Sequence, residues 1–100
     1  MGGTIEVGPD VTWSAAGWLF DWVLSQVASE VSDAEFAGHL RGIVGENLGY
    51  LSLPEVKAQQ RTQFRDAVQG LRSIAGGTWR DFDGRDGALE RLDALKECIG

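Results

Sequence analysis

The segment Trp13–Val31 constrains the fold of this chain more than any other, because it carries three of the four tryptophans. At about 100° per residue, its apolar side chains would occupy one helical sector roughly 200° wide. A helix on the surface of a globular protein needs an apolar sector of only about 100°. The sequence therefore predicts a central helix over residues 12–31, with neighbouring elements on two or three sides.

Three further helices are predicted from apolar periodicity and from capping patterns. Ser32, with Glu35 three residues later, predicts a helix over 33–48, and Ser52 with Glu55 predicts another over 53–75. The pair Gly76-Gly77 favours a helix end at that point, and the last helix is expected over 87–98. The beginning of the chain alternates polar and apolar residues, but no partner strand is evident, so we expect an irregular N-terminal arm.

These segments predict an all-α fold, a single domain over 1–100 built as a compact bundle of four helices. Gly38, Gly42 and Gly45 fall inside the second helix, where each costs about 1 kcal/mol relative to alanine. We interpret these glycines as a surface of close backbone approach. The approaching backbone would belong to the central helix or to a second copy of the chain in a homodimer.

The formal net charge of −6 is unevenly distributed along the chain. Residues 1–50 hold seven acidic residues and one basic residue, whereas residues 51–100 hold eight of each. All of the excess negative charge therefore belongs to the first half. Such a field repels nucleic acid and anionic membranes and attracts basic proteins.

Cysteine content and hydropathy both favour a cytoplasmic location. Cys98 is the only cysteine, so an internal disulfide is impossible, which fits a reducing compartment. The apolar run Trp13–Leu24 is too short for a transmembrane helix, which needs about 20 residues, and it contains Asp21. No basic segment typical of a signal peptide precedes it, and we expect no membrane association.

The predicted partner-binding surface combines a tryptophan at the edge of the apolar sector with the carboxylates of the first half, a composition typical of interaction hot spots. Its candidate residues are Trp18, Asp21, Glu30, Asp33, Glu35 and Glu46. In its small size, acidic first half, lone thiol and lack of a reaction motif, the chain resembles bacterial immunity proteins, which neutralise nuclease toxins. That resemblance implies a non-catalytic, antitoxin-type inhibitor that covers the active surface of a basic partner.

Two other functions are left open by the residues. A basic stripe on the helix over 53–75 is typical of the recognition helix of a helix-turn-helix regulator, although the acidic balance makes nucleic acid an unfavourable partner. That stripe consists of Lys57, Arg61, Arg65 and Arg72. Glu35, His39 and Glu46 project from one flank of their helix and would suit a small helical enzyme or metal protein.

Residues 79–90 match part of a calcium-binding loop, since Asp81, Asp83, Gly84 and Glu90 stand at expected offsets. Trp79 occupies the first ligand position, however, and an indole cannot coordinate calcium. We therefore interpret these aspartates as turn and cap residues. The sequence predicts no cofactor, no metal site and no catalytic residues.

Overall fold

The computed structural model describes residues 2–99 and combines helices with a small mixed sheet. The all-α prediction is therefore wrong, and the fold is α+β. The predicted domain of 1–100 includes residues 1 and 100, which lie outside the described residues. In chain order the elements are β1 (Gly2–Gly8), β2 (Val11–Ala16), α1 (Gly17–Glu30), α2 (Ala34–Gly45), β3 (Tyr50–Ser52), the 3₁₀ turn η1 (Leu53–Glu55), α3 (Ala58–Thr78) and α4 (Arg85–Ile99).

The start of the chain is a β-hairpin and not the predicted irregular arm. Strand β1 pairs antiparallel with β2, with Ile5 opposite Trp13, and the connecting turn places Asp10 at a φ of 65°. On its other edge β1 pairs in parallel with β3, with Ile5 opposite Leu51, which gives the strand order β2-β1-β3. The missing partner strands were Val11–Ala16, most of which the prediction placed in a helix, and Tyr50–Ser52, which lies far along the chain.

Helix α1 starts at Gly17, five residues later than the predicted residue 12. Trp13 belongs to β2, where it is buried and its indole Nε1 donates a hydrogen bond to the carbonyl oxygen of Arg91 at 2.7 Å. From Gly17 onward the prediction of a central helix is correct, because α1 contacts α2, α3 and the hairpin. Its buried residues are Leu19, Phe20, Val23, Leu24, Val27 and Ala28.

The boundaries of the next two helices differ from the prediction because their caps differ. Asp33, and not Ser32, caps α2, since its Oδ1 accepts a hydrogen bond from the amide of Phe36 at 3.0 Å. Ser52 does not cap α3 either, because its hydroxyl donates to Glu6 Oε1 at 3.1 Å in the sheet. Helix α3 instead begins at Ala58 and continues through Gly76-Gly77 to Thr78.

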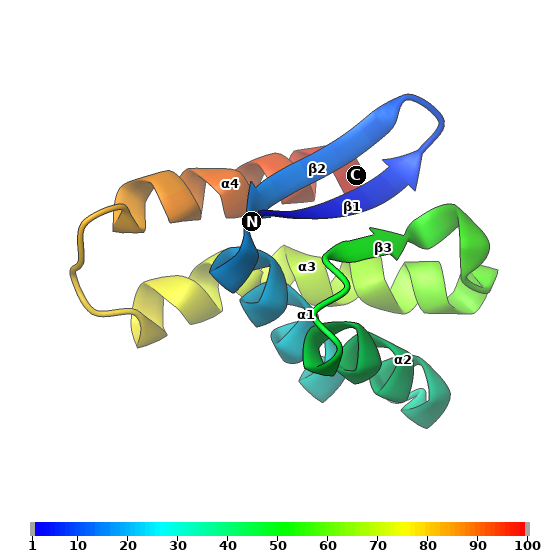
Figure 1. Cartoon of the computed structure of the whole chain (residues 1–100). Helices are drawn as coiled ribbons and strands as arrows, with labels where there is room; N and C mark the ends of the chain where they lie inside the picture. The colour runs from blue at the N-terminus through cyan, green and yellow to red at the C-terminus, as the bar shows by residue number, and fades with distance from the viewer. Residues whose placement is uncertain (1, 100) are drawn as a thin grey trace.

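A single hydrophobic core joins the three strands and all four helices. In Figure 1 the hairpin and α4 lie at the top, α2 lies at the bottom, and α1 and α3 lie between them. Aromatic side chains fill the centre, with Trp13, Phe20, Phe36 and Phe64 each no more than 1% exposed. Along residues 2–99, no helix combines the length and apolar composition needed to span a bilayer.

The glycines of α2 do not make the predicted close approach within the chain. Gly38, Gly42 and Gly45 are exposed, and a Cβ built on any of them would have no neighbouring atom within 4 Å. The interpretation that α1 packs on this glycine surface is therefore wrong. Close approach occurs instead in β1: a Cβ on Gly3 would overlap the buried ring of Phe20, and one on Gly2 would lie 2.9 Å from the carbonyl oxygen of Ala15.

Gly3 and Gly38 give opposite predictions for substitution by alanine. Gly3→Ala is expected to destabilise the fold by about 1–3 kcal/mol, because the closely packed Phe20 ring must move. Gly38→Ala is expected to stabilise it by about 0.5–1 kcal/mol through helix propensity. Urea unfolding followed by tryptophan fluorescence measures both changes, and a destabilising Gly38→Ala would show that this surface is packed after all.

Candidate functional site

The structure divides the predicted partner-binding residues between two places. Trp18 and Asp21 lie in the first turns of α1, and Trp18 packs against the loop between α3 and α4. The remaining candidates lie at the two ends of α2. Glu30 ends α1, Asp33 and Glu35 begin α2, and Glu46 directly follows it.

Trp18 belongs to an aromatic cluster made by α1 and the α3–α4 loop. Its ring centroid lies 5.5 Å from that of Trp79 and 5.9 Å from that of Phe82, and Trp22 lies 4.9 Å from Trp79. The rings meet edge to face, an arrangement that stabilises each pair beyond simple burial. Trp18 is 50% exposed, beside an open hollow of about 360 Å³ that is also lined by Arg91.

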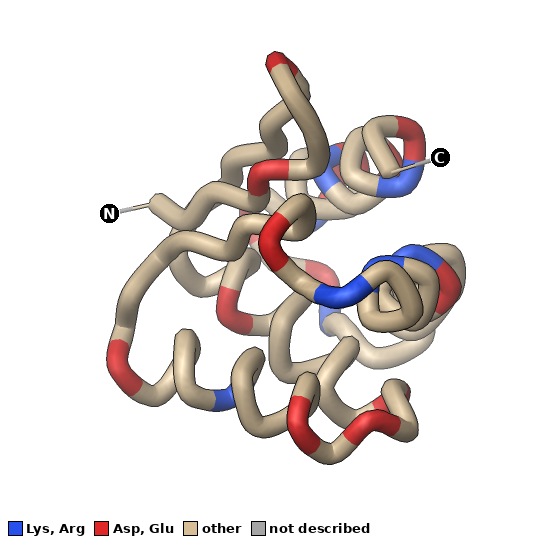
Figure 2. Tube along the Cα trace, turned by 90° about the vertical axis from the view of Figure 1, so that its right-hand side faces the viewer, with Lys and Arg blue, Asp and Glu red and all other residues tan. Residues whose placement is uncertain are grey.

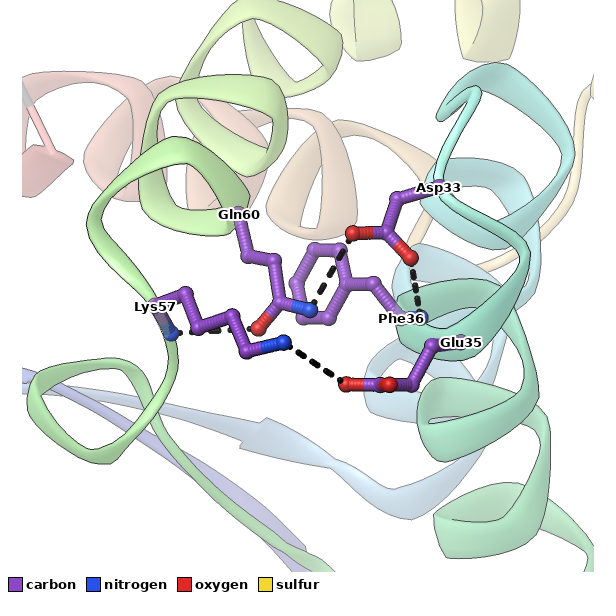
Figure 3. Close-up of polar contacts among 5 residues, drawn as sticks. All are labelled: Asp33, Glu35, Phe36, Lys57 and Gln60. Atoms are coloured by element: carbon purple, nitrogen blue, oxygen red, sulfur yellow. Dashed lines mark hydrogen bonds and ion pairs between the residues drawn. The ribbon is translucent and has the colours of Figure 1, made fainter.

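A polar latch joins the start of α2 to the start of α3 (Figure 3). Asp33 accepts hydrogen bonds from the amide of Phe36 at 3.0 Å and from Gln60 Nε2 at 3.2 Å. Gln60 in turn accepts from the amide of Lys57 at 3.1 Å, and the Lys57 ammonium lies 3.4 Å from Glu35 Oε1. The Gln60 side chain therefore hydrogen-bonds at the start of α2 and at the start of α3, and it holds the two helix starts side by side.

The Asp33 carboxylate has a pKa below its ordinary value of 3.8. The largest cause is the hydrogen bond from the Phe36 amide, followed by the hydrogen bond from Gln60. Both donors favour the charged form, and the partial positive charge at the start of α2 acts in the same direction. Asp33 is thus a structural cap, and its two oxygens are already used within the chain.

Two hollows lie side by side between α2 and the segment 48–57, and together they are called the α2–β3 trough here. The hollows have volumes of about 250 and 300 Å³, and they share His39, Glu55 and Val56. Helix α2 contributes one wall, with Glu35 at one end and Ile43 at the other. Strand β3 and η1 contribute the other wall, with Tyr50 and Glu55.

The trough is acidic and carries exposed apolar side chains. Glu35 and Glu55 line it, and Lys57 is the only Lys or Arg among its lining residues. Glu6 adjoins it, because its carboxylate accepts hydrogen bonds from Tyr50 at 3.3 Å and from Ser52. At one end, Leu48 is 58% exposed and Tyr50 is 48% exposed.

Glu46 directly follows α2 and lines neither hollow of the trough. Most of the basic residues lie elsewhere, as Figure 2 shows: blue positions gather over α3 and α4, whereas the rest of the chain carries mainly red ones. Arg72 pairs with Asp93 of α4 at 3.3 Å, so it does not neutralise the acidic first half.

Sequence reasoning missed four residues of this site, namely Glu6, Leu48, Tyr50 and Glu55. Glu55 was assigned to a capping box, and Glu6 was assigned to the irregular arm. No local sequence pattern could have predicted that these residues lie together, because the trough forms only where β3 pairs with β1 and η1 turns back towards α2.

The residues of the two alternative functions are also placed by the structure. Arg61, from the basic stripe, donates to the carbonyl oxygens of Leu53, Pro54 and Val56 at 2.8–3.4 Å and so closes η1. Between residues 2 and 99, no three His, Cys, Asp or Glu side chains are grouped so as to hold a metal ion.

Comparisons with protein-family models, with curated proteins and with solved structures found no match for this chain.

Asp33 is expected to add stability above pH 3.8 that disappears as the pH falls through its lower folded-state pKa. Asp33→Asn keeps a capping oxygen but cannot titrate, so its stability should depend less on pH between about 5 and 2. Asp33→Ala should also lower stability at pH 7, because it removes the cap. Urea midpoints measured across this pH range give both results, and equal acid dependence in wild type and Asp33→Asn would contradict the assignment.

Proposed function

We propose that this protein is a non-catalytic acidic binding module that covers a basic surface of another protein, in the manner of an inhibitor of a basic toxin. The observation that carries the proposal is the α2–β3 trough, where carboxylates and exposed apolar side chains occur together. We also propose that it acts in the cytoplasm, where its single thiol at Cys98 would stay reduced.

Charge supports the proposal at long range. Glu6, Glu35 and Glu55 lie at or beside the trough, Glu46 directly follows α2, and Lys57 provides one compensating cation. The Lys57 ammonium lies 3.4 Å from Glu35 and offsets its charge at long range, so the net negative field at this surface comes mainly from Glu6 and Glu55. A field of this kind accelerates encounter with a cationic partner and disfavours anionic ones.

Apolar exposure supports the proposal at short range. Leu48 and Tyr50 are large side chains that the core leaves about half uncovered, and both lie at one end of the trough. Tyrosine is enriched at interfaces because its ring buries apolar area while its hydroxyl keeps a polar partner, here Glu6. Of the predicted residues, Glu35 lines the trough, whereas Trp18 lies at the aromatic cluster made by α1 and the α3–α4 loop.

Site-directed photo-crosslinking identifies the partner through this surface. A photoreactive phenylalanine derivative replaces Leu48, and the same residue at Gly70, exposed on α3 with open space around it, is the control. Irradiation in the source cell is expected to capture a basic protein from position 48 and not from position 70. The product of the adjacent reading frame is the first candidate to test directly with purified proteins.

The double variant Glu35→Gln/Glu55→Gln is expected to slow association with that partner about tenfold at low salt. Glu90→Gln/Glu97→Gln on α4 removes the same charge away from the trough and should change the rate far less. Stopped-flow association at two salt concentrations measures both variants. Equal effects of the two double variants would show that net charge, and not this surface, governs binding.

A further inference from the structure

We infer that the α2–β3 trough takes an extended, lysine- or arginine-rich segment of the partner, which adds to the free edge of β3. The inference rests on the proposed function and deepens it, because it specifies the conformation and chemistry of the partner at this surface. Four observations carry it: a free strand edge, the length of the trough, its charge and the position of Lys57.

Strand β3 is an edge strand with a free side. Its sheet order is β2-β1-β3, so within residues 2–99 no strand lies beyond it. The carbonyl oxygen of Gly49 faces β1, because it accepts a hydrogen bond from the amide of Thr4 at 2.9 Å. In a trans peptide the next N–H points the opposite way, so the amide of Tyr50 points away from β1. An extended segment can pair with such an edge through its main chain.

The dimensions of the trough suit a few extended residues. Its α2 wall runs from Glu35 to Ile43, which is about 12 Å at the helical rise. That length accommodates about four residues of an extended chain. Alternate side chains of such a segment would lie on opposite sides of it, so one set would face the carboxylates of Glu35 and Glu55.

Lys57 already shows which chemistry the carboxylates of the trough accept. Its Nζ lies 3.4 Å from Glu35 Oε1 in an exposed pair, which is weak and readily exchanged. An incoming lysine or arginine at Glu35 would take the place of this ammonium group. Lys57 therefore acts as an internal competitor, and its removal strengthens binding of a basic segment.

A short basic peptide tests the inference on the intact protein. The probe is acetyl-Lys-Val-Lys-Val-Lys-amide, with the matching Glu-Val peptide as its control, titrated to millimolar concentration and followed by amide NMR shifts. The basic peptide is expected to shift the amides of segment 48–57 and of the facing side of α2, and to slow hydrogen exchange at the Tyr50 amide. The acidic peptide is expected to shift neither.

Lys57→Gln is expected to tighten binding of the basic peptide about two- to fivefold more than Lys96→Gln, which makes the same charge change on α4. Shifts confined to other surfaces, unchanged exchange at Tyr50, or equal effects of the two lysine variants would each overturn the inference. If the partner needs Glu35 and Glu55 for binding but the peptide does not bind in the trough, this inference is wrong and the proposed function stands. Peptide binding as expected, with a partner indifferent to Glu35 and Glu55, would support the inference and overturn the proposed function.

Discussion

The structure depends on β1 having a strand on each side. Ile5 lies at the middle of that arrangement, fully buried, opposite Trp13 on one side and Leu51 on the other, which are both 1% exposed. A buried strand must satisfy its backbone N–H and C=O groups, and a two-stranded ribbon alone is marginal in water. The parallel pairing with β3 therefore fixes residues 50–52 against the start of the chain, although Glu6 and Ser52 are 46 positions apart.

That pairing also creates the surface on which the proposed function rests. Because β3 is held by β1, the chain must turn through η1 before α3 can begin, and this turn places Glu55 across from α2. The latch between Asp33, Gln60 and Lys57 then sets the spacing between α2 and the start of α3. The trough is thus the space between β3, which is held by β1, and α2, which is held by the contacts of the latch.

The acidic field survives folding because several of the cations are engaged away from the trough. Arg72 pairs with Asp93 in the second half of the chain, and Arg61 is engaged by three carbonyl oxygens. Arg91 lies over the ring of Trp13, with its guanidinium carbon 5.8 Å from the ring centroid. Only Lys57 reaches a carboxylate of the trough, through an exposed pair. The uneven charge of the sequence therefore remains uneven on the folded surface.

The sequence allowed prediction of those features that depend on neighbouring residues. Apolar spacing from Leu19 to Val27 identified the central helix. The same reasoning failed at Trp13, because its position fits the apolar sector of a helix and also the buried side of a short strand. It failed at Ser52 for a related reason. The residues of a capping box are present there, but the Ser52 hydroxyl donates to Glu6 in a distant strand instead of capping a helix.

By itself, then, the sequence determined the helical core and the uneven charge, since both follow from residue identities within a few turns of one another. Only the tertiary structure decided that the first residues form a hairpin, that β3 joins it in parallel, and that Glu6, Glu35, Tyr50 and Glu55 lie at or beside one trough. Strand pairing joins backbone groups across any sequence separation, and backbone groups are nearly the same at every residue. Local patterns therefore cannot reveal which strands will meet.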